Sequence, residues 1–132
     1  FFFTGPHGYF VFRPSARHPV LVATGSGIAP FSAMCRSGLS GFTLLHGVRR
    51  PEQRYYAELF RRAADRYVAC LGLPRRSDED WFAGRVTDYL AKQLPAGEYD
   101  FYLCGRGEMV RDATRIIDER FSGARVYTEV FF

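Results

Sequence analysis

The chain has 132 residues, of which 47% are hydrophobic and 24% are charged, and its formal net charge is +4. This length suits one compact domain that buries its own core, and no stretch approaches the roughly 18 uninterrupted apolar residues of a membrane helix. The first residues also lack the basic segment, apolar stretch and cleavage site of a secretory signal. We therefore expect a cytoplasmic protein without a membrane span.

Three cysteines and three histidines are scattered along the chain. They are Cys35, Cys70, Cys104, His7, His18 and His46. The cysteines are odd in number and never form a C-x-x-C pair, which argues against a disulfide framework or a zinc site. The histidines form no ligand pair at helical or hairpin spacing. We expect reduced cysteines and no metal site.

The first half of the chain alternates β-rich apolar runs with helical patterns, and only the opening residues fall outside this alternation. Strands are expected at 20–24, 42–46 and 67–71. Helices are expected at 28–36 and 54–64, and the second of these has apolar residues at spacings of three and four that would share one face. They are Tyr55, Tyr56, Leu59, Phe60 and Ala63.

The same alternation continues in the second half. A short helix is expected at 86–94, closed by Pro95 and Gly97, and strands are expected at 99–104 and 125–130. Between these two strands an apolar stripe lies opposite a charged face, which indicates an amphipathic helix that ends near Gly123. The stripe consists of Met109, Val110, Ala113, Ile116 and Ile117.

Five strands that alternate with helices, several of them apolar on both faces, predict a three-layer α/β/α domain. Its sheet would be parallel, with right-handed crossovers, and the expected strand order is 3-2-1-4-5. A ligand would bind beyond the carboxyl ends of the strands, where the order reverses. We assign residues 15–132 to this domain and residues 1–14 to a preceding segment or linker.

The most informative stretch is Thr24-Gly-Ser-Gly-Ile-Ala-Pro-Phe31, which follows the first strand and opens the first helix. Gly25 and Gly27 allow a sharp turn and a close approach of the backbone to a ligand. The helix that follows offers unpaired N–H groups and the positive end of its dipole to a pyrophosphate, and Pro30 suits an early helical position. In this context we predict phosphate binding, the alternative being an ordinary glycine-rich turn.

This stretch differs from the usual dinucleotide fingerprint, because Pro30 replaces the third glycine and no acidic residue ends the second strand. That strand ends instead in His46-Gly-Val-Arg-Arg50. An acidic residue would hold a ribose 2′-hydroxyl, whereas an arginine accepts a 2′-phosphate or stacks on adenine. The arginines therefore favour NADP over NAD.

Five motifs together resemble the ferredoxin–NADP reductase family, in that family's order and over essentially the whole chain. They are T-G-S-G-I-A-P-F, G-V-R followed by Y-x-E-L-F, W-F-A-G-R-V, Y-L-C-G-x-x-x-M-V and the terminal T-E-V-F-F. The run Gly5-Pro-His-Gly-Tyr-Phe10 is similar to the close of the family's flavin-binding barrel, which makes residues 1–14 a remnant of that barrel and its linker. The resemblance implies the NAD(P)-binding domain of a flavoenzyme.

The resemblance also implies which residues bind the nucleotide. The pyrophosphate and nicotinamide ribose would lie against Thr24, Gly25, Ser26, Gly27, Ile28, Ala29 and Pro30. A 2′-phosphate would meet Arg49, Arg75 and Arg85, although Pro74 stands where the family commonly has a serine before the second arginine. The alternative is that these arginines are solvated loop residues.

Near the nicotinamide, the resemblance places Cys104, with Gly105 and Met109 in the same turn. A buried cysteine that only packs is the alternative. Glu129 and Phe131 would complete the catalytic site, with the Phe131 ring over the flavin, and Phe132 would reach the flavin's adenine side. The alternative for these terminal residues is ordinary packing of an edge strand.

The implied reaction is a reversible hydride transfer between NAD(P)H and FAD, followed by electron exchange with ferredoxin, another iron–sulfur protein or a flavodoxin-like carrier. The flavin-binding R-x-Y-S/T strand is absent from these 132 residues, so we expect the isolated chain to bind nucleotide weakly and to be inactive without its FAD domain, in cis or on another chain. The rival interpretation is a non-catalytic nucleotide-binding module or a subunit of a multi-subunit electron-transfer complex. Nucleic-acid binding is disfavoured, because the arginines do not form one stripe with interleaved aromatic residues.

Overall fold

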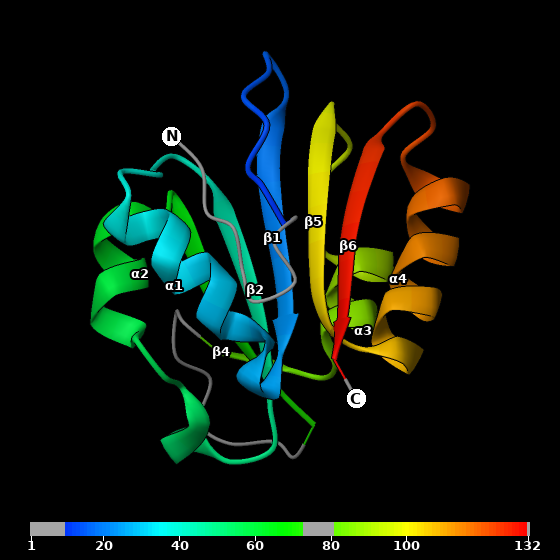
Figure 1. The fold of residues 1–132 in the computed structure, drawn as a ribbon. Coiled ribbons are helices and arrows are strands. Elements are labelled where there is room, and N and C mark those ends of the chain that lie inside the picture. Colours follow the sequence, from blue (N-terminus) through cyan, green and yellow to red (C-terminus); the bar gives the residue numbers. More distant parts are fainter. Residues whose placement is uncertain (1–9, 73–80, 132) are drawn as a thin grey trace.

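The computed structural model describes residues 10–72 and 81–131, which form a parallel six-stranded sheet between two layers of helices (Figure 1). The strands are β1 (His18–Thr24), β2 (Thr43–Val48), β3 (Arg66–Leu71), β4 (Trp81–Ala83), β5 (Tyr99–Arg106) and β6 (Arg125–Phe131). The helices are α1 (Ala29–Arg36), α2 (Ala57–Ala63), α3 (Val86–Lys92) and α4 (Gly107–Arg120), with 3₁₀ turns η1 (Gly25–Ile28) and η2 (Pro51–Gln53). The α/β fold expected from the sequence is confirmed.

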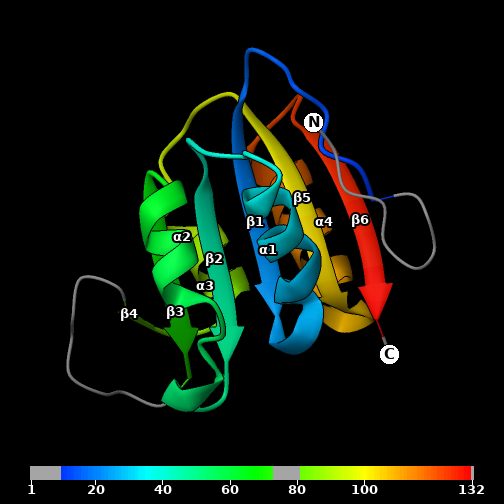
Figure 2. The same cartoon turned by 60° about the vertical axis from the view of Figure 1, so that its left-hand side comes forward.

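The core lies on both faces of the sheet. Strand β1 is buried from Val20 to Ala23, because its alternate side chains pack on opposite helix layers. Helices α1 and α2 cover one face, which holds Leu21 and Ala23, while α3 and α4 cover the other, which holds Val20 and Val22 (Figure 2). Strands buried on both sides explain the continuous apolar runs of the sequence.

The predicted count of five strands is wrong. The sheet has six strands in the order β4-β3-β2-β1-β5-β6, and the five expected strands keep their predicted order within it. The additional strand, β4, is three residues long and pairs only with β3, from Ala69↔Trp81 to Leu71↔Ala83. A short, partly exposed edge strand carries too little periodicity to be seen in a sequence.

Helix α2 begins later than expected, at Ala57. Tyr56 adopts a left-handed backbone conformation with φ of 62°, which no continuous helix permits. Tyr55 and Tyr56 are therefore 50% and 43% exposed and do not join the apolar face that the sequence pattern assigned to them. Phe60, one turn further on, is fully buried as predicted.

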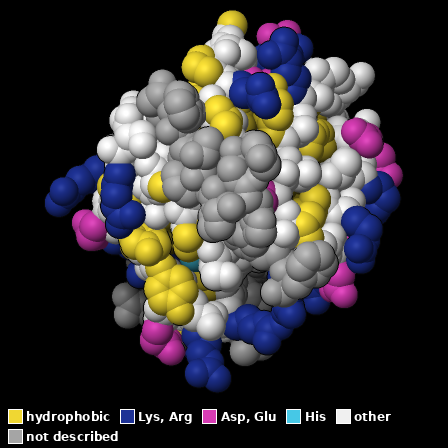
Figure 3. All heavy atoms as spheres, in the orientation of Figure 1, with side chains coloured by type: hydrophobic (Ala, Val, Ile, Leu, Met, Phe, Trp, Pro, Cys, Tyr) yellow, Lys and Arg dark blue, Asp and Glu magenta, His cyan; other side chains and the backbone are white. Residues whose placement is uncertain are grey.

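Helix α4 follows its predicted amphipathic pattern, with Ile116 only partly buried at the margin of the stripe. Arg120 ties its end to the neighbouring helix α3 of the same layer by donating to the carbonyl oxygens of Leu90 and Leu94. No helix within residues 10–72 and 81–131 is long and apolar enough to cross a membrane. Basic side chains form separate groups around the face in Figure 3 rather than one continuous stripe.

The segment that leads into β1 is fixed on the α1 face of the sheet. Phe10 and Phe12 are buried there, and the Phe12 ring stacks on Tyr102 with centroids 5.3 Å apart. The Tyr102 hydroxyl accepts a hydrogen bond from the Arg13 N–H at 2.8 Å and lies 3.2 Å from the Arg13 carbonyl oxygen. Further along, the Ser15 hydroxyl donates to the buried Asp100 at 2.5 Å. These contacts define the path of the chain into the domain.

Candidate functional site

The order of the strands reverses at β1, which lies between β2 and β5. In doubly wound sheets, ligands bind beyond the carboxyl ends of the strands at such a switch point. A cleft of about 560 Å³ opens at this edge, which is the lower edge of the sheet in Figure 1. The ends of β1, β2, β3 and β5 and the first turns of α3 and α4 contribute its lining.

The loop after β1 forms the inner wall of the cleft. It turns at Gly25, whose φ of 54° is left-handed and easily adopted only by glycine. A Cβ at Gly27 would lie 2.8 Å from the carbonyl carbon of Cys104, so the loop backbone rests directly on β5. The chain then continues through η1 into α1, with Pro30 in the first helical turn.

The end of β5 forms a second glycine turn against the first. Gly105 has φ of 151°, and a Cβ there would collide with the Thr24 hydroxyl. The Thr24 hydroxyl oxygen accepts a hydrogen bond of 3.2 Å from the Arg106 backbone N–H. The two turns are thus locked together, and their backbones approach the cleft without intervening side chains.

The other side of the cleft comes from the end of β2 and the start of α3. Gln53 Oε1 accepts hydrogen bonds from the N–H groups of Arg49 (2.9 Å) and Arg50 (3.2 Å), which folds η2 back onto the strand end. The Arg85 N–H donates to Asp88 Oδ2 at 2.9 Å, which satisfies a free donor at the beginning of α3. Arg49 and Arg85 are exposed and line the cleft.

Charged side chains are distributed unevenly along the cleft. Arg49 and Arg85 lie at the β2–α3 end, while Arg106, Glu108 and Asp112 lie at the β5–α4 end. The first end is purely basic and suits phosphate, whereas the second combines one cation with two carboxylates. Within the described part of the chain, no three His, Cys, Asp or Glu side chains are placed to hold a metal ion.

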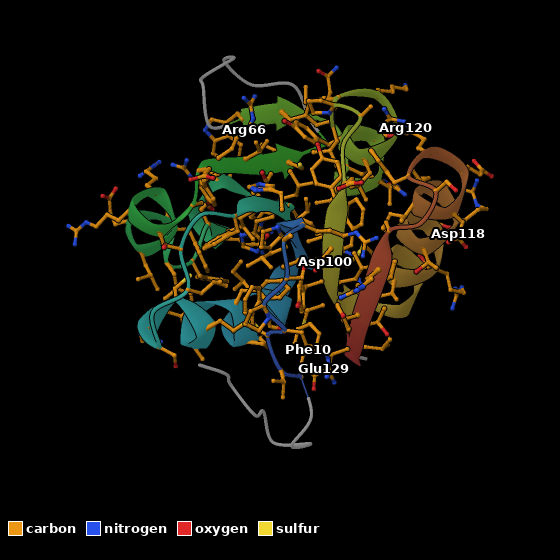
Figure 4. All side chains as sticks on the ribbon, turned by 90° about the horizontal axis from the view of Figure 1, so that it is seen from above. Phe10, Arg66, Asp100, Asp118, Arg120 and Glu129 are labelled. Carbon is orange, nitrogen blue, oxygen red and sulfur yellow. The ribbon has the colours of Figure 1, made fainter. Side chains whose placement is uncertain are left out.

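Cys104 and Glu129 lie outside the cleft lining, side by side on the α1 face of the sheet. They are register partners on β5 and β6, and paired residues of parallel strands point to the same face. Burial first, and then the negative charge of Glu129, raise the pKa of the Cys104 thiol to about 12. Glu129 Oε2 is buried without a hydrogen-bond partner among the described residues. Glu129 and Phe10 lie on the same side of the sheet in Figure 4.

Two glycine turns at the switch point of a parallel sheet indicate a nucleotide-binding site, and a match to a known protein family agrees with this. Residues 21–115 match the model of the oxidoreductase NAD-binding domain. The chain belongs to this family.

Individual relatives of this NAD-binding domain are larger proteins. The electron transfer component of toluate 1,2-dioxygenase from Pseudomonas putida is 33% identical over 96% of this chain, which spans 41% of that protein. The solved structure of the cytochrome P450 reductase GcoB from Amycolatopsis is 27% identical, with a TM-score of 0.71. The match covers 96% of this chain and 42% of the GcoB chain. The FAD/NAD-binding domain of nitric oxide dioxygenase from Vibrio cholerae shares the fold, with 24% identity and a TM-score of 0.70. This match covers 94% of this chain and 55% of the V. cholerae chain.

The NAD-binding domain brings many of the residues expected from the sequence to one place. Those that line the cleft are Thr24, Gly25, Ser26, Arg49, Arg85, Gly105 and Met109. The remaining loop residues do not line it and are Gly27, Ile28, Ala29 and Pro30. Ile28 is only 1% exposed and packs in the core. Arg75, Phe132 and the side chain of Phe131 lie outside what the structure describes.

Several lining residues of the NAD-binding domain were not predicted. They include Gly47, Gln53, Cys70, Gly72, Thr87, Arg106, Glu108 and Asp112. Some could have been found, because Gly47 and Gly72 stand at or just after the carboxyl ends of expected strands, where ligands approach. Glu108 and Asp112 are one helical turn apart, and only the docking of α4 shows that they face the cleft.

Proposed function

We propose that this chain is the pyridine-nucleotide-binding domain of a flavin-dependent oxidoreductase, which passes hydride between NAD(P)H and FAD and electrons onward to an iron–sulfur protein. The observation that carries the proposal is the pair of interlocked glycine turns beside the cleft at the switch point of the sheet. Family membership supports nucleotide binding, and the P. putida relative is an electron transfer component of a dioxygenase.

The residues of the cleft fit a dinucleotide. Gly27 and Gly105 allow the two turns to pack closely, whereas Gly25 lines the cleft and a Cβ there would meet no described atom within 4 Å. A pyrophosphate could therefore approach the loop backbone closely at Gly25. Arg49 and Arg85 supply positive charge at the β2–α3 end. They would hold the adenylate 2′-phosphate, which supports a preference for NADP over NAD. Arg75, assigned to the same role, lies outside the described residues.

The nicotinamide half would occupy the β5–α4 end of the cleft. Glu108 and Asp112 face it, and an oxidised nicotinamide ring carries a positive charge that two carboxylates favour. Cys104 directly precedes the second glycine turn at this end, and it lies with Glu129 on the α1 face of the sheet. We assign to these two residues the placement of the ring against the flavin.

When bound, the nicotinamide and the flavin supply the hydride chemistry, and the domain contributes binding and orientation. Cys104 stays protonated near neutral pH because its pKa is about 12, so it offers a neutral S–H group rather than a thiolate. Oε2 of Glu129, which has no hydrogen-bond partner among the described residues, would accept a hydrogen bond from the cofactor. Phe131, as the next residue but one on β6, remains predicted to cover the flavin ring.

The flavin-binding domain would be joined through the segment that precedes β1. Residues 10–14 are assigned with residues 1–9 to the close of the flavin-binding barrel and its linker, and Phe10 and Phe12 pack on the β5 side of the α1 face through Tyr102. This packing supports an attachment of the preceding domain beside β5. It would bring that domain over the face that carries Cys104 and Glu129.

The proposal is tested in two steps. Calorimetry on this chain should detect binding of NADP⁺, with weaker binding of NAD⁺. In the longer protein that includes the upstream coding sequence, anaerobic NADPH should bleach the flavin absorbance, and a ferredoxin-type protein should restore it. Nucleotide binding without a flavin, or with a flavin that NADPH never reduces, would instead support a non-catalytic nucleotide-binding module.

A further inference from the structure

His46 is a buried polar residue that the proposed chemistry does not use. It lies in β2 with 0% of its surface exposed, at the centre of a row of register partners across the sheet. Ala23 of β1 and Ala69 of β3 flank it at the same level. Both are fully buried, and their small side chains leave room for an imidazole ring on the α1 face.

The ring of His46 makes one hydrogen bond among the described residues. Its Nε2 atom lies 3.1 Å from the carbonyl oxygen of Gly25, the turning residue of the loop. A carbonyl oxygen can only accept a hydrogen bond, so Nε2 carries the proton and Nδ1 does not. Nδ1 has no partner within the described structure. Burial lowers the pKa of His46, which keeps this ring neutral near pH 7.

This hydrogen bond has a consequence for the loop. Gly25 has a left-handed φ, and its carbonyl oxygen turns inward to the His46 ring rather than outward to the cleft. A phosphate site needs N–H groups directed at the anion, and a carbonyl dipole aimed at the same point would repel it. The loop can therefore bind phosphate well only while this carbonyl group is held on the sheet side.

We propose that His46 is a positioning residue of the nucleotide site, whose Nε2–H group holds the Gly25 carbonyl away from the bound pyrophosphate. The inference rests on the proposed function, since it assigns the loop to a pyrophosphate. His46 does not touch the nucleotide. It acts across the strand register, from β2 to the loop that follows β1.

Two substitutions of nearly equal size separate the hydrogen bond from the packing. His46→Gln places an amide N–H donor near the position of Nε2, whereas His46→Met fills the same space without a donor. We expect His46→Gln to bind NADP⁺ within about threefold of wild type, and His46→Met to bind it about tenfold more weakly. The order of thermal stability should be the reverse, with His46→Met more stable than His46→Gln, because a buried methionine is better tolerated than a buried amide.

A second ligand distinguishes local positioning from general damage. Adenosine 2′-monophosphate carries the 2′-phosphate but no pyrophosphate, so His46→Met should leave its affinity unchanged. Equal losses of NADP⁺ affinity in both variants, or a parallel loss for adenosine 2′-monophosphate, would overturn the positioning role. Should His46→Met fail to fold, heteronuclear NMR of the wild-type imidazole decides, and an Nδ1-protonated ring would overturn it. A wild-type chain that binds neither NADP⁺ nor NAD⁺ refutes the proposed function itself.

Discussion

Replacing Gly27 by alanine should damage the nucleotide site through a single added methyl group. The new Cβ would lie 2.8 Å from the carbonyl carbon of Cys104 and 3.0 Å from the Cα of Gly105. Both are backbone atoms of β5, so no flexible side chain can move aside. Relaxation of the first contact to an ordinary carbon–carbon distance of about 3.5 Å requires the loop to retreat from β5 by at least roughly 0.7 Å, and the carbonyl oxygen of Cys104 lies closer still.

This overpacking should lower the free energy of unfolding by about 1–3 kcal/mol. Because Gly25 and Ser26 of the same loop line the cleft and would move with Gly27, NADP⁺ affinity should fall by about tenfold or more, a loss typical of misplaced binding groups. Gly27 has no left-handed φ, so the effect reports the close approach and not backbone strain. Urea denaturation and calorimetry measure the two quantities on the same protein.

Gly107→Ala is the matched control. A Cβ at this first residue of α4 would meet Arg111 Nη1 and Val130 Cγ1 at 3.6 Å each, which is ordinary contact. Alanine is also the better helix former, so stability should be equal or slightly higher, with unchanged NADP⁺ affinity. A Gly27→Ala protein with the stability and affinity of the wild type would refute the interpretation of the interlocked turns.

Three further predictions address charge, protonation and the leading segment. Arg49→Ala and Arg85→Ala should each weaken NADP⁺ binding by about tenfold in calorimetric titrations and leave NAD⁺ nearly unaffected, because only NADP⁺ carries the 2′-phosphate; equal losses for both nucleotides would contradict this assignment. The pKa of Cys104 is about 12 in the folded chain against 9.0 ordinarily, so the unfolded thiol ionises first and the free energy of unfolding should fall as pH rises from 9.0 toward 12. Urea denaturation across this range should show a shallower decline for Cys104→Ala, and an identical slope would argue against the raised pKa. Tyr102→Phe removes the acceptor of the Arg13 N–H and should lower the free energy of unfolding by about 1–3 kcal/mol without changing NADP⁺ affinity; a change in affinity alone would show that the segment serves the site directly.

Most of the architecture could be predicted from the sequence because it depends on short-range patterns. Apolar runs near β1, β2, β3 and β5 are buried on both faces, and each lies within one β-rich stretch. The glycine loop was found the same way, since strand, glycines and helix follow one another directly from Thr24 onward. Two features escaped these patterns, the short edge strand β4 and the left-handed Tyr56 that delays α2.

The sequence by itself determined five of the six strands and their order in the sheet, the four helices between them and the place of the glycine turn. Only the tertiary structure decided which distant residues meet. His46 reaches the carbonyl oxygen of Gly25, and Cys104 pairs with Glu129, because strand register aligns residues that lie 21 and 25 positions apart in the chain. The physical reason is that hydrophobic periodicity is a property of residues close together in the chain. Strand register, by contrast, is set only when several strands bury their faces against the same helices.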